Sequence, residues 1–386
     1  MTVLTRGLSF EQGPIRPPSE ASSLLLRFTR NCPWNKCTFC PVYKGTPFER
    51  RSLREIKKDI DAVAQIIDEI KALSWSLGEG GEVTEPVVRA IMTSNTAGHC
   101  HRHVAAWLYW GTGHVFIQDA NSLIMKTDDL AEALRYLKER IRGITRITSY
   151  ARSSTLSRKS LEELKILKEA GLSRIHVGME SGSDKVLAFV KKGATAKQHV
   201  DAGLKVIEAG MTLSEYIMPG LGGKEMTFEH AVETARVLNE INPHFIRLRS
   251  LRIPPVVPLY EDVQKGRFTP LHDDEVVREI RIMIERLEGV TSTLTSDHIM
   301  NLLEEVQGTF PEDKPKMLAV IDEYLELPEH DKLLFRLGRR GGTLRSIRQI
   351  YDPDVRSRLE VALKELTTET GFDVETLIKE LADRYI

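Results

Sequence analysis

Three of the four cysteines in this 386-residue chain, Cys32, Cys37 and Cys40, lie within nine residues. The C-x4-C-x2-C spacing places three thiolates on one short segment, where they can ligate three corners of a 4Fe–4S cluster. The fourth iron then has no protein ligand, and an open coordination position distinguishes a reactive metal site from a closed structural one. Because only Cys100 is left over, we expect no second cysteine-ligated cluster.

A closed zinc site is the alternative for these thiols, with a fourth ligand from Cys100 or from His99, His101 or His103. Zinc modules usually carry two C-x-x-C halves and this chain has one, so the spacing favours the cluster. The three histidines are spaced by two, which on a strand would place them on one face, where they could bind a metal or a substrate. Polar loop residues without a ligand are the simpler interpretation.

Apolar periodicity predicts the elements that must position these residues. Short apolar, β-branched runs alternate with segments of helical period, and six such repeats predict a parallel sheet with covering helices. No Gly-x-Gly-x-x-Gly follows the first strand, which disfavours a dinucleotide-binding fold. The predicted fold class is α/β, a partial (β/α)6 TIM-like barrel whose chemistry lies at the carboxyl ends of its strands. The predicted strands are 23–29, 114–117, 144–150, 174–177, 213–218 and 245–248, and the main predicted helices are 52–73, 127–142, 157–170 and 227–239.

Two breaks divide the chain. The glycine-rich segment 78–82 opens an insertion at about 75–110, and the proline-rich segment 254–258 precedes a charged remainder of helical character. We therefore predict an N-terminal extension at 1–22, a core barrel at 23–260 and a helical C-terminal domain at 261–386.

Polar motifs follow four of the predicted strands. They are Gln-Asp-Ala-Asn at 118–121, Tyr-Ala-Arg-Ser at 150–153, Gly-Met-Glu-Ser-Gly-Ser-Asp at 178–184 and Met-Pro-Gly-Leu-Gly-Gly at 218–223. Singly, such motifs have ordinary interpretations: a plain turn, a helix cap or a generic phosphate-binding loop. Their order on consecutive strand ends, beside the cysteine segment, favours one shared site.

With these motifs the chain resembles the radical S-adenosylmethionine (SAM) superfamily over about residues 23–260. That superfamily has a partial βα-barrel with a three-cysteine loop after its first strand, usually spaced C-x3-C-x2-C. This chain has one extra residue between Cys32 and Cys37. The 178–184 motif is similar to the corresponding stretch of methylthiotransferases and of the Elongator acetyltransferase subunit.

The resemblance implies roles for residues beyond the cysteine ligands. The aromatic between the last two cysteines and the turn at 218–223 would lie near the adenine of SAM, and the turn at 118–121 would hold the methionine amino group. The arginine after the third strand would suit the SAM carboxylate, and the glutamate after the fourth would face the amino or ribose end. The implied SAM-binding residues are Phe39, Asp119, Asn121, Arg152, Glu180 and Gly220.

The resemblance also implies a reaction. The reduced cluster would donate one electron to the SAM sulfonium, and the resulting 5′-deoxyadenosyl radical would abstract hydrogen from a small-molecule or peptide substrate. The electron would come from an external one-electron reductant such as a flavodoxin or ferredoxin. Two alternatives stay open: a non-catalytic iron–sulfur protein that transfers electrons or delivers a cluster, and a zinc-stabilised scaffold.

The charge balance bears on partners. The chain has 54 Lys and Arg against 55 Asp and Glu, a net charge of -1, so no positive excess indicates nucleic acid or an anionic membrane. No apolar run has the length that spans a bilayer, and the first 22 residues lack the layout of a signal peptide. We therefore expect a cytoplasmic protein with no nucleic-acid and no membrane partner.

Overall fold

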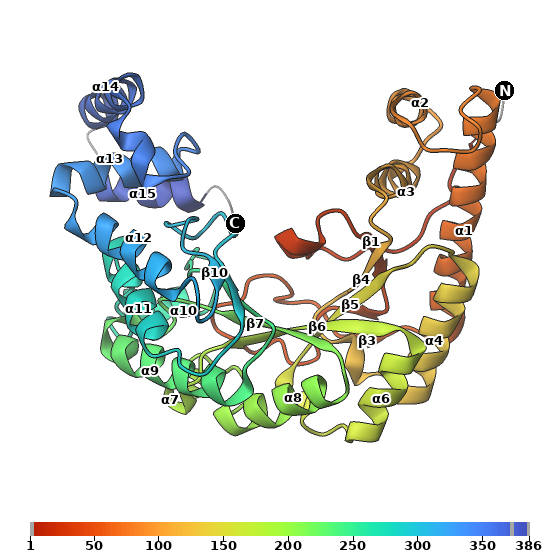
Figure 1. Ribbon diagram of the computed structural model, residues 1–386, viewed down its shortest axis with the longest axis horizontal. Helices are drawn as coiled ribbons and strands as arrows, with labels where there is room; N and C mark the ends of the chain where they lie inside the picture. Colours follow the sequence, from red (N-terminus) through yellow and green to blue (C-terminus); the bar gives the residue numbers. More distant parts are fainter. Residues whose placement is uncertain (1–3, 371–373, 384–386) are drawn as a thin grey trace. The chain divides into compact units, whose positions relative to one another are not determined.

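A mostly parallel sheet forms the core of the computed structural model, which describes residues 4–370 and 374–383 (Figure 1). A second, two-stranded antiparallel sheet pairs β2 (Thr29–Arg30) with β3 (Glu49–Arg50). In the main sheet β8 and β9 are parallel, whereas β10 is antiparallel to β9. The strand order is β1 (Leu24–Arg27), β4 (His114–Gln118), β5 (Arg146–Ala151), β6 (Leu172–Glu180), β7 (Thr212–Ile217), β8 (Phe245–Leu248), β9 (Thr293–Thr295) and β10 (Gly308–Thr309).

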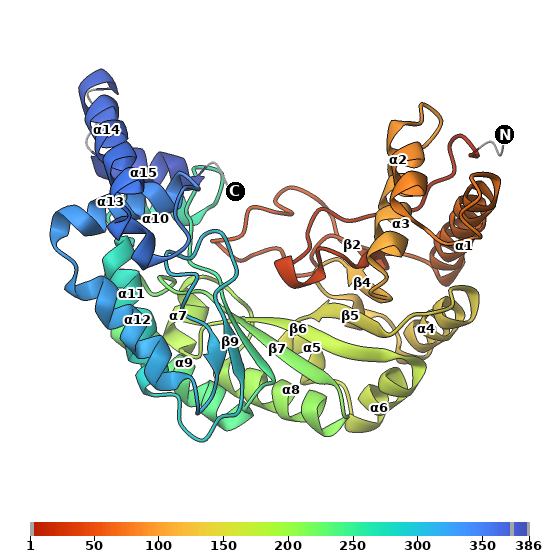
Figure 2. The same cartoon turned by 45° about the horizontal axis from the view of Figure 1, so that its top comes forward.

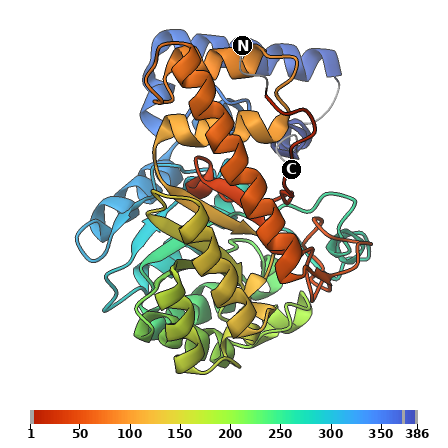
Figure 3. The same ribbon diagram turned by 90° about the vertical axis from the view of Figure 1, so that its right-hand side faces the viewer.

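The chain divides into two compact units. Unit 1 comprises 1–35, 42–177 and 204–213. Within it α1 packs beside α3 and α4, and Figure 3 shows the long helix α1 (orange) alongside α4. The helical elements of unit 1 are η1 (Pro18–Glu20), α1 (Leu53–Ser76), α2 (Glu85–Thr93), α3 (His99–Trp110), η2 (Ser122–Ile124), α4 (Thr127–Arg140), α5 (Ser153–Leu156) and α6 (Leu161–Ala170).

Unit 2 comprises 36–41, 178–203 and 214–386, and α8 (Ala196–Glu208) has residues in both units. Within unit 2 the helix α11 (Asp273–Glu285) packs against α9 (Gly223–Ile241) and α12 (Lys314–Glu326), and Figure 1 shows it between them. The remaining helical elements of unit 2 are α7 (Asp184–Phe189), α10 (Leu259–Gln264), α13 (Glu329–Arg340), η3 (Ile347–Tyr351), α14 (Pro353–Thr370) and α15 (Val374–Asp383).

Helix α1 shows how local sequence specifies an element. Ser52 caps it by accepting a hydrogen bond from the backbone N–H of Glu55, whose carboxylate in turn accepts from the Ser52 N–H. This reciprocal capping satisfies two backbone donors that a helix start leaves open. The buried face repeats at helical spacing and includes Ile56, Ile60, Val63, Ile66 and Ile70.

The predicted α/β partial barrel is confirmed, and each of the six predicted strands is present. Two short strands, β9 and β10, lie in the region that was predicted to be helical. Thr293–Thr295 has β-branched threonines at both ends and adds to the edge of β8, where pairing outweighs the helical character of its surroundings. The domain division near residue 260 stays a prediction. Among the described residues, no helix is both long and apolar enough to cross a membrane.

Candidate active site

The predicted site residues follow the carboxyl ends of parallel strands, where chemistry is expected in a βα-barrel. Asp119 comes directly after β4, and Arg152 directly after β5. Glu180 is the last residue of β6, and Gly220 follows β7 by three residues. The three cysteines lie between β2 and β3, on residues 31–43, which we call the cysteine loop.

Hydrogen bonds within unit 1 hold the first part of the cysteine loop. Cys32 is half-buried, and the backbone N–H of Asn35 donates to its Sγ at 3.5 Å. Lys44 Nζ donates to the carbonyl oxygen of Asn35 at 3.0 Å. Hydrogen bonds to cysteine sulfur help to set the reduction potential of an iron–sulfur cluster, so the Asn35 N–H lies where it could act in that way.

The second part of the loop belongs to unit 2. The backbone N–H of Thr38 donates to the carbonyl oxygen of Val190, and the carbonyl oxygen of Thr38 accepts from the N–H of Leu259, both at 2.9 Å. The residues on either side, Cys37 and Phe39, are buried. These contacts fix the backbone from which both side chains project.

The thiols keep the chemistry that ligation requires. The four cysteines are all described, and each lies outside a disulfide. Cys40, like Cys32, is half-buried. Within the described ranges, no three His, Cys, Asp or Glu side chains gather into a metal-binding group, so ligation by the three loop cysteines stays a prediction.

Asp119, which the resemblance assigns to the SAM amino group, is fully buried in unit 1. Its Oδ2 accepts hydrogen bonds from Arg27 Nε at 2.5 Å and from the backbone N–H of Asn31 at 2.8 Å. Its Oδ1 accepts from the Tyr43 hydroxyl at 2.8 Å. Three protein donors therefore occupy this carboxylate, and its predicted contact with SAM stays untested.

Asn121 joins the ends of β4 and β5. Its Oδ1 accepts from the backbone N–H of Arg152 at 3.1 Å, and its Nδ2 donates to Thr155 Oγ1 at 2.8 Å. The guanidinium of Arg152 lies 5.1 Å from the ring centroid of Trp34, within cation–π distance. Arg152, the residue predicted to bind the SAM carboxylate, thus lies beside an aromatic of the cysteine loop.

Glu180 is paired with a lysine that the sequence reasoning missed. Lys192 Nζ lies 2.9 Å from Glu180 Oε1 and 5.8 Å from the ring centroid of Phe39. Lys192 is therefore the residue of unit 2 that links Glu180 to the aromatic of the cysteine loop. The only sequence signal was a pair of lysines after α7, which by itself is typical of a solvated surface.

A second missed residue is Glu215 in β7, which is 1% exposed. Burial raises the pKa of Glu215 well above its ordinary value, and the Glu180 carboxylate adds to that rise while Lys192 opposes it. Such surroundings disfavour the charged form of the carboxyl group. Nothing in the apolar alternation of the strand marked this position as special.

Gly220 needs to be glycine. Its φ of 87° lies in the left-handed region, which side chains other than glycine adopt at a cost. Its backbone N–H donates to Oε1 of the buried Glu279 at 2.6 Å, and the other carboxylate oxygen accepts from Thr227 Oγ1 at 2.6 Å. Sequence reasoning missed Glu279 because it lies 59 residues downstream, on α11.

The three histidines of the insertion lie on the helix α3, which begins at His99, so they do not share a strand face. The rings of His99 and His103 stack with centroids 6.5 Å apart, whereas His101 Nε2 lies 3.1 Å from Glu69 Oε2. His103 Nε2 accepts from the backbone N–H of Leu25 at 3.0 Å. Burial lowers the pKa of His103 to about 4, so it stays neutral and holds α3 against β1.

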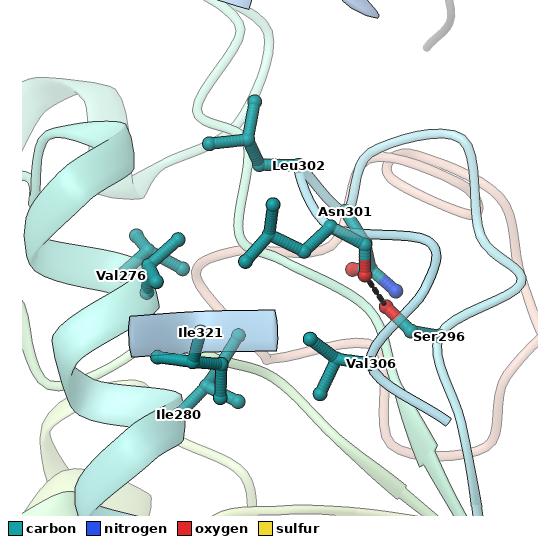
Figure 4. Close-up of a pocket in the computed structure, with 9 residues that line it drawn as sticks. Val276, Ile280, Ser296, Asn301, Leu302, Val306 and Ile321 are labelled. Carbon is teal, nitrogen blue, oxygen red and sulfur yellow. Dashed lines mark hydrogen bonds between the residues drawn. The ribbon is translucent and has the colours of Figure 1, made fainter. Parts of the chain in front are cut away.

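A small pocket in unit 2 is lined mainly by aliphatic side chains of α11 and of the segment after β9 (Figure 4). Its polar residues are Ser296, whose Oγ donates to the carbonyl oxygen of Leu303 at 2.8 Å, and Asn301. The pocket has room for about one water molecule. It is therefore too small for SAM or for an organic substrate.

The fold and these residues define a class of protein. Residues 26–238 match the sequence profile of the family described as Radical SAM superfamily. Because this match covers more than half of the chain, the protein belongs to the radical SAM superfamily of enzymes. Membership implies a 4Fe–4S cluster and SAM as cofactors.

Three curated proteins illustrate the range of its relatives. The chain is 21% identical to the tRNA uridine(34) acetyltransferase of Methanocaldococcus jannaschii, over 64% of this chain and 46% of that protein. It is 24% identical to the heme chaperone HemW of Bacillus subtilis, over 45% and 46%. It is 28% identical to the tRNA-2-methylthio-N(6)-dimethylallyladenosine synthase of Hahella chejuensis, over 60% and 43%. The chain thus spans less than half the length of each of these relatives.

Solved structures resemble the fold at low identity. Methylornithine synthase (PylB) has a TM-score of 0.41 and 14% identity, and the match covers 72% of this chain and 67% of that one. The cobalamin-dependent radical enzyme OxsB has a TM-score of 0.44 and 14% identity, over 95% of this chain and 54% of that one.

Proposed function

We propose that this chain cleaves SAM reductively at a single 4Fe–4S cluster held by Cys32, Cys37 and Cys40. When bound, such a cluster supplies one electron to the SAM sulfonium, which yields methionine and a 5′-deoxyadenosyl radical that abstracts hydrogen from a substrate. An external one-electron donor, such as a flavodoxin or ferredoxin, must supply that electron. The observation that carries the proposal is the loop of three thiols after the first strand of a parallel barrel, inside the region that matches the family.

The residues present fit such a cofactor. Thiolates are the usual ligands of iron–sulfur clusters, and the three loop thiols lie outside disulfides. The fourth thiol, Cys100, is buried in α3, where the backbone N–H of Phe10 lies 3.5 Å from its Sγ. Cys100 therefore serves packing within unit 1.

The proposed SAM contacts bind and orient the molecule and do not react themselves. A cation suits the carboxylate of SAM, a buried aromatic suits the adenine, and a carboxylate suits the amino or ribose end. Close placement is essential because a radical attacks whatever lies within reach. The residues that we propose for these contacts are Phe39, Asn121, Arg152, Glu180 and Gly220. Asp119, which the resemblance also assigns to SAM, already accepts hydrogen bonds from three protein donors.

Replacement of one ligand tests the proposal. After anaerobic reconstitution and reduction with dithionite, we expect the wild-type chain to convert SAM to 5′-deoxyadenosine and methionine. Cys37→Ala should lose both the cluster absorbance and 5′-deoxyadenosine production, because two thiolates cannot hold the cluster with one open iron. Iron content, absorbance and chromatography of the products measure the three quantities.

The matched control is Cys100→Ser, which removes the thiol that we place outside the site. This variant should keep the cluster and the formation of 5′-deoxyadenosine. Production of 5′-deoxyadenosine by Cys37→Ala would contradict the ligand assignment. A wild-type chain that holds a cluster and leaves SAM intact would contradict the reaction.

We propose a small-molecule or peptide substrate. Two of the relatives are named for tRNA, but the balance of 54 basic against 55 acidic residues provides no excess of positive charge for a nucleic acid. A second candidate stays open, a non-catalytic iron–sulfur protein that transfers electrons or delivers a cluster. One relative is likewise named as a chaperone and not for a reaction. That candidate predicts a stable cluster without 5′-deoxyadenosine in the same experiment.

A further inference from the structure

We infer that Asp119 is a positioning residue that anchors both ends of the cysteine loop. Its donors come from three separate segments of unit 1: Arg27 at the end of β1, Asn31 at the start of the loop and Tyr43 at its end. Asn31 directly precedes Cys32. The role of this anchor in catalysis rests on the proposed function. The hydrogen bonds of Asp119 are independent of that proposal.

The backbone conformation at the start of the cysteine loop needs contacts that maintain it. Asn31 and Asn35 have φ values of 67° and 45°, in the left-handed region. Asparagine adopts this region more readily than other non-glycine residues, but the conformation still persists only when surrounding contacts enforce it. The Asp119 carboxylate enforces it at Asn31 by accepting the backbone N–H directly.

The charge of the anchor is balanced within unit 1. Arg27 donates to Asp119 and also lies 3.1 Å from Glu11, so the buried carboxylate has a cation beside it. Burial raises the pKa of Tyr43 above its ordinary value, and the Asp119 carboxylate adds to that rise. The Tyr43 hydroxyl therefore keeps its proton and remains a donor.

The N-terminal segment covers the anchor. The backbone N–H of Gly13 donates to Gln118 Oε1 at 2.8 Å, and Gln118 Nε2 donates back to the carbonyl oxygen of Gly13 at 3.0 Å. A Cβ on Gly13 would collide with Asp119 Oδ1. Figure 2 shows this N-terminal segment (red) beside β4. The close approach encloses the Asp119 carboxylate in protein, which suits a positioning role.

Two variants test whether Asp119 anchors the loop, one by changing its carboxylate and one by crowding it. Asp119→Asn removes the charge that holds the donors, and Gly13→Ala pushes a methyl group against the carboxylate without changing it. The test uses the metal-free protein with its thiols kept reduced. We expect iodoacetamide to alkylate Cys32 about tenfold faster in both variants, because weaker hydrogen bonds to the carboxylate lower the free energy of opening the cysteine loop. Mass spectrometry of the peptide that carries Cys32 measures this rate. In the reconstituted protein, a chelator should extract iron faster from both variants.

The matched controls are Asp68→Asn, on the exposed side of α1, and Gly98→Ala, where the nearest atom to a new Cβ is 4.0 Å away. Both should alkylate at the wild-type rate. Tyr43→Phe removes one donor and should give an intermediate rate, which keeps the inference testable if Asp119→Asn unfolds.

Wild-type alkylation rates in Gly13→Ala and Tyr43→Phe would overturn the anchor. A raised SAM dissociation constant in Asp119→Asn with an unchanged alkylation rate would also overturn it, because it would indicate direct contact with SAM. If the wild-type chain takes up no cluster, the proposed function fails while the alkylation result still decides the anchor.

Discussion

We expect Glu215 to make the stability of the folded chain depend on pH. Its Oε2 has no hydrogen-bond partner among the described residues, and burial raises its pKa well above the ordinary value of 4.5. Above pH 4.5 the unfolded chain releases the Glu215 proton while the folded chain retains it. The free energy of unfolding therefore falls as pH rises from 4.5 through the folded-state pKa.

Glu215→Gln should remove this penalty, because the amide has nearly the same shape and does not ionise. We expect the variant to unfold at a higher temperature than the wild type at pH 8, and the two to differ little at pH 4.5. The gain amounts to about 1.4 kcal/mol for each unit by which the pKa is raised. Thermal unfolding at both pH values measures it, with the exposed Glu365→Gln as the control. An equal shift at pH 4.5 and pH 8 would show that the effect comes from packing.

Lys192 should affect SAM binding through Glu180. Lys192→Met leaves the Glu180 carboxylate without its cation while it keeps much of the length of the side chain. We expect the dissociation constant of SAM to rise about tenfold, because the Glu180 carboxylate loses the charged hydrogen bond that holds it. Cluster content should stay at the wild-type level, and Lys192→Arg should restore part of the affinity. Lys197→Met, on the exposed surface of α8, serves as the control. An unchanged dissociation constant in Lys192→Met would remove Lys192 from the site.

Elements with a strong local signal were predictable, and those that depend on distant partners were not. The predicted strand at 245–248 coincides with β8, and the reciprocal cap at Ser52 marked the start of α1. The strand predicted at 23–29 is divided at Phe28, and β9 depends on the exposed edge of β8, which no local pattern reveals. The same limit applies to the site. Arg152 directly follows a strand end, so its place in the sequence indicates a role in the site. The role of Lys192 depends on contacts that the chain makes only after α7 has folded.

The contact between α3 and β1 has its own consequence for stability. His103→Leu leaves the Leu25 N–H without its acceptor, which should cost about 1–3 kcal/mol at pH 7. Because burial lowers the pKa of His103 from 6.5 to about 4, the unfolded chain binds more protons in that interval. The wild type should therefore lose stability as pH falls from 6.5 towards 4.

Urea unfolding at pH 7 and pH 5 tests both parts of this expectation. The gap between the wild type and His103→Leu should be smaller at pH 5, since leucine does not titrate. His330→Leu, at an exposed position of α13, controls for the loss of a histidine as such. A gap that is constant with pH would mean that His103 contributes packing alone.

Across the whole chain, the sheet continues beyond the predicted boundary at residue 260. Within unit 2, β9 pairs in parallel with β8, and α11 packs against α9. The side chain of Asn301 accepts from the backbone N–H of Ser250 at 2.9 Å and donates to the carbonyl oxygen of Leu248 at 2.8 Å. Residues after 260 thus complete the hydrogen bonding of the last barrel strand.

A chain that ends at residue 260 should therefore fold poorly. Removal of β9 leaves the edge of β8 unpaired, and removal of α11 exposes the apolar face of α9, two features that promote aggregation. Light scattering after size exclusion should show oligomers, and thermal unfolding should begin well below that of the full chain. The control is a chain that ends at residue 352, which keeps β9 and α11 and loses α14 and α15. This longer chain uncovers part of α13 but keeps the sheet edge of β8 paired, so it should aggregate less than the 1–260 chain. A monomeric 1–260 chain that unfolds near the full-length temperature would instead establish 23–260 as an independent barrel, and the contacts of Asn301 would then be dispensable for its folding.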